Sequence, residues 1–346
     1  MYNYHKQINF YEETKVDLSE DIRDDLYAKR ETNRKRLKSN LPENIKMAEN
    51  HFIPQGSMAM RTTIQENGQE YDIDDGVWFY AEDLKKKGII FTVDMTVDDV
   101  RQMVLDAVKD DKFNKSPKIM DNCIRVFYAE GYHVDIPAYR LTRDGDNEVQ
   151  EIAGKDAWRK SNPTEINSWF DNRVQELNKQ NADGGKQFRK MIRLMKRFSK
   201  SRGEKWDMPS GLKLTMLIDE SFQFYLERDD EAFYNLLKTI KTRLDGNLAV
   251  YNRAQNGNQD MLTKTNSDTN MMELKNHIGE ALVELAVIEK KDCTKKAVRK
   301  AWDWVFKTDG FLDDFDENDD NNDKGIAPVV PTAPVVKQET KFGSHA

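Results

Sequence analysis

The sequence predicts an α+β protein of two lobes, with a mixed β-sheet and helices in the first lobe and helices alone in the second. Its 346 residues are more than one small hydrophobic core usually organises. Segments with strand character, rich in aromatic and β-branched residues, occur before about residue 144, and amphipathic segments of helical period dominate after it. We therefore expect a sheet lobe over residues 1–151, a helical lobe over residues 152–315 and a disordered tail over residues 316–346.

The first lobe is expected to begin with a long charged helix from about residue 17 to residue 50, which Asn40-Leu41-Pro42 interrupts. The turn at Glu130-Gly131 joins two expected strands, and Pro137 is expected to end the second of them or to mark a sheet edge. The elements expected after the long helix are an extended piece at 51–57, a strand at 71–80, a helix at 96–110 and strands at 123–128 and 132–139.

In the second lobe the spacing of apolar residues predicts six helices. Gly184-Gly185 is interpreted as a break before the most amphipathic of them, and the polar stretch 253–270 as a loop. The expected helices span residues 162–178, 186–201, 209–226, 231–244, 271–289 and 294–308.

Composition excludes several classes of protein. The formal net charge of −7 is not that of a protein that coats nucleic acid, and no apolar run reaches the length of a membrane span. The first residues lack the pattern of a secretory signal, and the two cysteines, Cys123 and Cys293, form no C-x-x-C pair, so we expect a cytoplasmic protein. Residues 186–205 nevertheless hold nine bases and one acid, which favours a small polyanion such as a nucleoside triphosphate as ligand.

The segment YDIDDG places two carboxylates two residues apart in an expected strand. Side chains alternate between the faces of a strand, so Asp72 and Asp74 are expected on one face and Ile73 on the other, with Asp75 directed away from the site. Two carboxylates this close repel each other unless a cation lies between them, and Mg²⁺ prefers such oxygen ligands. A solvated acidic strand end remains the simpler alternative for an isolated D-x-D motif.

Two further features favour the metal site. Gly56-Ser57 precedes the carboxylates at an expected turn, where backbone N–H groups and a hydroxyl suit a phosphate. Asp135 supplies a third carboxylate from another apolar strand. Three carboxylates on neighbouring strands can hold the two Mg²⁺ ions of an in-line nucleotidyl transfer, with Mn²⁺ as an alternative.

The motifs QGS, YDIDDG and HVDIPAY together resemble the nucleotidyltransferase signature of the polymerase-β superfamily. More narrowly, they are similar to the bacterial cGAS/DncV-like nucleotidyltransferases (CD-NTases), and most similar to the cyclic GMP-AMP synthase branch. The resemblance extends from about residue 50 to residue 225. It implies a polymerase-β-like core joined to a helical lobe, with a central cleft in which donor and acceptor nucleotides bind.

The resemblance also implies individual roles. Asp72 and Asp74 would bind both metals, and Asp135 would complete the second metal site and help deprotonate the attacking hydroxyl. The residues expected to contact nucleotides are Gln55, Gly56 and Ser57 at the donor turn, Arg125 and Lys196 near phosphates, Lys200 one turn beyond, and Ser210 in the nucleotide pocket.

Several of these residues have simpler interpretations. Lys196 is equally well an ordinary exposed lysine on a basic helix, Ser210 a helix N-cap, and Arg125 a structural partner of Glu130 or Asp135. His133 is expected on the face opposite Asp135, as a core histidine.

As a whole, the resemblance implies synthesis of a cyclic di- or oligonucleotide messenger, such as a cGAMP-like product, from ATP and other NTPs including GTP, in anti-phage (CBASS) signalling. The product would act on a downstream effector, and an E1/E2-like partner is a candidate for conjugation at Ala346. We expect a monomer, no membrane contact and no DNA activator. The alternatives are a linear oligoadenylate or RNA-end nucleotidyltransferase, and an inactive nucleotide-binding scaffold.

Overall fold

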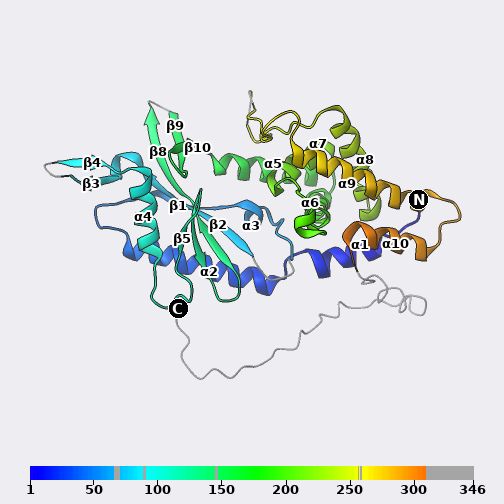
Figure 1. Cartoon of the computed structure of the whole chain (residues 1–346), viewed down its shortest axis with the longest axis horizontal. Coiled ribbons are helices and arrows are strands. Elements are labelled where there is room, and N and C mark those ends of the chain that lie inside the picture. The colour runs from blue at the N-terminus through cyan, green and yellow to red at the C-terminus, as the bar shows by residue number, and fades with distance from the viewer. Residues whose placement is uncertain (66–70, 89–90, 145–146, 256, 258, 309–346) are drawn as a thin grey trace, which may run out of the picture.

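The computed structural model describes residues 1–65, 71–88, 91–144, 147–255, 257 and 259–308. In Figure 1 a β-sheet with its covering helices lies on one side, and a group of helices lies on the other. The strands are β1 (Met47–Gln55), β2 (Asp72–Tyr80), β3 (Lys85–Lys87), β4 (Thr92–Asp94), β5 (Lys118–Ile119), β6 (Ile124–Phe127), β7 (His133–Ile136), β8 (Ala138–Asp144), β9 (Asn147–Ala153) and β10 (Trp158–Lys160).

The helices divide between the two sides. Those of the sheet side are α2 (Glu20–Asn40), α3 (Gly56–Met60) and α4 (Val97–Val108). Those of the other side are α1 (His5–Tyr11), α5 (Pro163–Gln180), α6 (Gly184–Lys200), α7 (Gly211–Ser221), α8 (Asp229–Gly246), α9 (Thr269–Leu285) and α10 (Lys295–Phe306). A π-helical turn, Glu12–Val16, follows α1 directly.

The sheet is mixed, as expected, and β2 lies at its centre. β1 pairs with β2 in the antiparallel sense, whereas β7 and β8 both run parallel to β2 along its other edge. β7 ends before Pro137 as expected, but Pro137 is not at a sheet edge: it lies between β7 and β8, and its carbonyl accepts a hydrogen bond from the Val77 amide. The missing N–H of proline therefore falls between two paired segments, where no ladder bond is lost.

One face of the sheet is apolar because every second residue of β2 is buried against helices. Ile73, Val77 and Phe79 pack in one cluster with Leu26 of α2 and Val104 of α4. The alternate residues of β2, which include Asp72 and Asp74, face the other way. At its first residues the strand therefore separates a hydrophobic core from a polar face, and this arrangement positions the candidate site. Further along, the second face is covered by another apolar cluster that includes Trp78.

The helical side has its own core, centred on α6. Phe188, Met191, Ile192, Met195 and Phe198 are all fully buried, which confirms the predicted apolar face. The helix break expected at Gly184-Gly185 lies just before them, at residues 181–183, and both glycines begin α6. A side chain at Gly184 would lie 2.5 Å from the Leu177 carbonyl oxygen, so this helix start requires a residue without Cβ.

The first sixteen residues pack with the helices rather than with the sheet. Tyr4, Ile8, Tyr11 and Val16 belong to the same buried cluster as α6. In Figure 1 the N-terminus accordingly lies beside α10. The division at residue 151 stays a prediction, and the expected tail over 316–346 lies outside the described residues.

Most other differences concern the element boundaries. Residues 47–50, expected as helix, begin β1, and β9 and β10 extend the sheet beyond the expected end of strand character near residue 144. Within the described ranges, no helix is both long and apolar enough to cross a membrane, and the two cysteines, Cys123 and Cys293, are unpaired.

Candidate active site

Three carboxylates meet on one face of the central strands. In the parallel pairing of β2 with β7, Asp74 lies beside Asp135, and Asp72 lies beside His133. Residues paired in this way point to the same face of a sheet. The register therefore brings together Asp72, Asp74 and Asp135 from segments sixty residues apart in the sequence, as the motifs predict.

Asp75 faces the opposite side of the sheet, where it belongs to the structure rather than the site. Its carboxylate accepts two hydrogen bonds from the Arg34 guanidinium of α2, at 2.6 and 2.5 Å. The Asp75 side chain is 4% exposed. The expectation that Asp75 points away from the other carboxylates is thus confirmed.

The electrostatic environment of Asp74 opposes its ionisation. Burial and the neighbouring Asp135 and Asp72 carboxylates raise the pKa of Asp74 from 3.8 to about 7, although the Arg125 guanidinium opposes this. Within the described residues, no hydrogen bond or ion pair is formed by the Asp74 side chain. A carboxylate in this position gains most from an added cation.

Arg125 and His133 already engage the other two carboxylates. The Arg125 guanidinium donates two hydrogen bonds to Asp135, at 2.8 and 2.7 Å, which is the structural pairing that the sequence left open. His133 lies with its Nδ1 atom 2.9 Å from Asp72 Oδ1. The expected orientation of His133 was wrong, because residues 133 and 135 are two apart in one strand and share a face.

Position 56 requires glycine because any side chain there would clash with the Asp74 carboxylate. Its φ angle of +67° suits glycine, and a Cβ atom there would lie 2.1 Å from Asp74 Oδ2. Gln55 precedes it opposite Asp74 in the β1–β2 pair, and the Tyr139 hydroxyl donates a hydrogen bond to its side-chain oxygen. The Ser57 hydroxyl lies 2.9 Å from that of Thr63. The donor turn therefore lies directly against the carboxylates.

A cavity of about 1080 Å³ begins at this turn and extends to α6 and α7. Asp72 lines this cavity, together with six of the seven residues that the sequence assigns to nucleotide binding. Of the seven, only Arg125 is not part of the lining. The six are Gln55, Gly56, Ser57, Lys196, Lys200 and Ser210.

Two of these side chains have informative contacts. The Lys196 ammonium donates hydrogen bonds to the backbone oxygen and the hydroxyl of Thr62, at 2.9 and 3.1 Å, so it is anchored beside the donor turn. Ser210 precedes α7 at the N-cap position, but its side chain makes no capping hydrogen bond. The N-cap alternative for Ser210 is therefore confirmed for its position, although the hydroxyl makes no capping bond.

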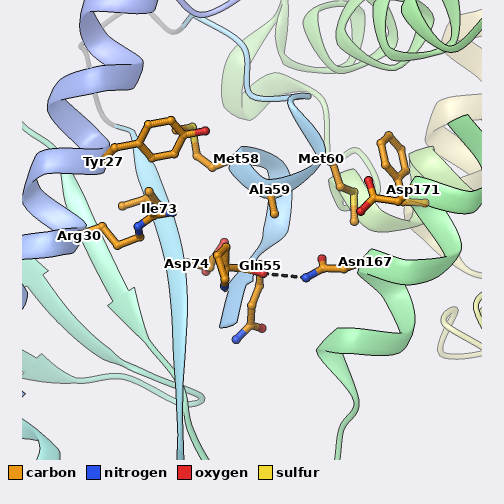
Figure 2. Close-up of a pocket in the computed structure, with 12 residues that line it drawn as sticks. Tyr27, Arg30, Gln55, Met58, Ala59, Met60, Ile73, Asp74, Asn167 and Asp171 are labelled. Carbon is orange, nitrogen blue, oxygen red and sulfur yellow. Dashed lines mark hydrogen bonds between the residues drawn. The ribbon is translucent and has the colours of Figure 1, made fainter. Parts of the chain in front are cut away.

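A second cavity, of about 380 Å³, adjoins the first (Figure 2). Asp74 and Gln55 lie on its wall, opposite Tyr27 and Arg30 of α2. Asn167 of α5 borders both cavities and donates a 2.7 Å hydrogen bond to the Pro54 carbonyl, which ties the helical side to the end of β1. The sequence signals for Asn167 and Thr62 are weak, because their role depends on tertiary contacts.

The donor set suits a hard divalent cation, because it consists of carboxylate oxygens with excess negative charge around Asp74. Among the residues that the structure describes, no three carboxylate, imidazole or thiol groups form a ready set of metal ligands. Both oxygens of Asp135 are held by Arg125. Asp74 is thus the carboxylate with no partner for its charge, whereas Asp135 would share its oxygens between Arg125 and a metal ion.

The mixed sheet, with two carboxylates on its central strand, a third on the neighbouring parallel strand and an adjoining helical half, is consistent with the polymerase-β-like fold that the motifs predict. Residues 50–139 match the family model of the cyclic GMP-AMP synthase DncV-like nucleotidyltransferase domain. This segment, which contains all three carboxylates, is therefore similar to the nucleotidyltransferase domain of that family.

Solved structures show the same fold over nearly the whole chain. The apo form of Vibrio cholerae DncV is 18% identical with a TM-score of 0.66, and the match covers 90% of this chain and 97% of that one. Vibrio cholerae DncV cyclic AMP-GMP synthase with the linear intermediate 5′ pppA(3′,5′)pG gives 18%, 0.66, 90% and 99%. Escherichia coli DncV bound to 3′-deoxy GTP gives 16%, 0.61, 84% and 92%. The predicted fold class is confirmed.

Proposed function

We propose that this protein makes a cyclic di- or oligonucleotide from nucleoside triphosphates by successive nucleotidyl transfers (two for a dinucleotide), each of which releases pyrophosphate. The observation that carries the proposal is the meeting of the Asp72, Asp74 and Asp135 carboxylates beside the Gly56-Ser57 turn, where Asp72 and the turn line the larger cavity and Asp74 lines the adjoining one. The family of residues 50–139 supports the reaction class, and the ligands named for the similar structures support NTP substrates and a cyclic product.

The proposed mechanism assigns binding and orientation to the protein. Two Mg²⁺ ions, or Mn²⁺ in their place, would neutralise phosphate charge at Asp72, Asp74 and Asp135. The Gly56 backbone approaches the carboxylates without a side chain, so a triphosphate there meets both the turn and the carboxylates. Lys196, beside the turn, supplies positive charge for the donor phosphates. Asp135, once released by Arg125, is the proton acceptor for the attacking hydroxyl, and Arg125 then becomes available to phosphate.

The size of the cavity supports two nucleotides in one site. A volume of about 1080 Å³ exceeds the usual size of a small-ligand pocket. Because the same carboxylates serve both transfers, the linear intermediate has to turn over within the cavity before the ring closes. A site that holds donor and acceptor together favours this over extension of a long RNA.

The experiment is to incubate the protein with Mg²⁺ and ATP, GTP, CTP and UTP, singly and together, and to analyse the products by mass spectrometry after phosphatase treatment. A phosphatase-resistant cyclic product formed from NTPs alone is the expected result. A product that requires added RNA would indicate an RNA-end transferase. NTP binding without pyrophosphate release would indicate an inactive scaffold.

The biological context stays a proposal as well. We propose a cytoplasmic monomer that acts in anti-phage (CBASS) signalling through an effector that binds the cyclic product. Conjugation of Ala346 by an E1/E2-like partner belongs to the same proposal; that residue lies outside the described ones. Detection of the product only in phage-infected cells would support the role, and its absence in infected cells would contradict it.

A further inference from the structure

Residues 60–63 follow the proposed donor turn, and three basic side chains of α6 bind this segment. Arg189, Arg193 and Lys196 occupy positions that share one face of a helix. Arg189 donates a 3.1 Å hydrogen bond to the Met60 carbonyl, Arg193 a 3.0 Å bond to the Arg61 carbonyl, and Lys196 a 2.9 Å bond to the Thr62 carbonyl. The carbonyls of three consecutive residues are thus bound by three side chains that lie about one helical turn apart on α6.

This segment is in turn bonded to the turn itself. The Thr62 amide donates a 2.8 Å hydrogen bond to the Ser57 carbonyl, and the Thr63 hydroxyl lies 2.9 Å from the Ser57 hydroxyl. Arg61 has a φ angle of +56°, which costs energy for a residue with a side chain. The segment therefore depends on external contacts to keep a conformation that positions Ser57.

Arg193 is the best-anchored member of the row. Its Nε atom donates a 2.5 Å hydrogen bond to Glu12, which is fully buried in the π-helical turn, and its Nη2 atom lies 3.4 Å from Asp17. The Arg193 side chain is 8% exposed. Both acids come from the N-terminal segment. Arg193 of α6 therefore contacts that segment and residues 60–63 at the same time.

We propose that Arg193, held by Glu12, is a positioning residue that fixes the Gly56-Ser57 turn for the donor triphosphate. This inference rests on the proposed function, since it assigns the turn to the triphosphate. Arg193 does not line the cavity, so it acts through the Arg61 carbonyl and not by touching the nucleotide. Its loss is expected to weaken NTP binding more than it slows turnover.

The test is Arg193→Lys, which keeps a charge beside Glu12 but cannot also reach the Arg61 carbonyl. We expect the KM for the NTP to rise about tenfold, the effect of one lost charge-assisted hydrogen bond, with kcat changed less than about twofold. Backbone amides of residues 57–63 should exchange hydrogen faster in the variant.

The matched control is Arg101→Lys. Arg101 is equally buried and binds the carbonyls of Gly154 and Lys155, but it lies outside both cavities. It should lose thermal stability to a similar extent and keep the wild-type KM. If Arg193→Lys does not fold, Arg189→Lys, at a more exposed position, should raise the KM about threefold.

An unchanged KM in the folded α6 variants, or an equal KM increase in the Arg101 variant, would overturn the positioning role. Direct binding of a fluorescent NTP analogue to the wild-type protein distinguishes a failure of the positioning role from a failure of the proposed function. If the wild-type protein binds no NTP, the proposed function fails, and the positioning role fails with it.

Discussion

Burial and two neighbouring carboxylates all disfavour the ionised form of Asp74. Because its pKa is raised from 3.8 to about 7, the folded protein binds one more proton at this position than the unfolded chain does between these pH values. The free energy of unfolding contributed by Asp74 is therefore greatest near pH 4 and falls as the pH rises toward 8.

Asp74→Asn removes this dependence, since the amide is neutral at every pH. The stability difference between the variant and the wild-type protein should grow in favour of the variant by roughly 2 kcal/mol as the pH rises from 5 to 8 in metal-free buffer. Urea unfolding at four pH values measures the difference. Asp106→Asn is the control, because a Lys109 hydrogen bond lowers the pKa of Asp106, and no gain with rising pH is expected there. A constant difference for the Asp74 variant would contradict the assignment.

Gly56 carries a second prediction about a single residue. Gly56→Ala should reduce activity at least about 100-fold, because the new methyl group displaces the Asp74 carboxylate from its position. Gly257→Ala adds a side chain at a similar positive φ, +86°, but into open space, and should leave activity near the wild-type value. Steady-state kinetics on both variants separates the contact from the backbone strain, and equal losses would refute the contact.

The three carboxylates and the Gly56-Ser57 turn were predictable because a strand's alternation and a short motif fix them locally. The partners of those residues were not. That Arg125 binds Asp135 depends on the pairing of β6 with β7, and that Lys196 binds Thr62 depends on how α6 packs against the donor loop. The sequence named these side chains but could not fix which atoms they contact.

Between elements, the Arg34–Asp75 pair joins α2 to the central strand beneath the site. Both partners are largely removed from solvent, with side-chain exposures of 17% and 4%. Asp75→Ala leaves the arginine with only its second, half-exposed partner Glu31 and should cost up to about 3 kcal/mol of stability, while activity per folded molecule is retained. Lys241→Ala breaks an exposed pair with Asp245 on α8 and should cost less than about 0.5 kcal/mol. Chemical denaturation of both variants checks this, and comparable costs would contradict it.

The elements themselves were predictable to different degrees. α4 and α6 have strong apolar periodicity, and the structure reproduces them to within about two residues. β9 reads NEVQEIA, in which polar residues predominate, so its strand conformation comes from pairing with β8 rather than from its composition. Such a strand gives little signal until its neighbour is known.

For the molecule as a whole, the large cavity lies between the sheet and the helical cores, and residues from β1, α3, α6 and α7 line it. A nucleotide bound there contacts both cores at once. A non-hydrolysable NTP with Mg²⁺, at about 100 times its Kd, should add about 2.7 kcal/mol of stability and raise the Tm by several degrees. Differential scanning calorimetry measures this shift. An equal shift without Mg²⁺ would contradict a metal-dependent donor site.

In the proposed mechanism, nucleotidyl transfer requires the carboxylates of Asp72 and Asp74 as metal ligands. The most direct test compares the wild-type protein with the Asp72→Asn, Asp74→Asn double variant, with radiolabelled NTPs and Mg²⁺, after equal folding is verified by circular dichroism. We predict labelled product from the wild-type protein and none above background from the double variant. Normal amounts of product from the double variant would contradict the account.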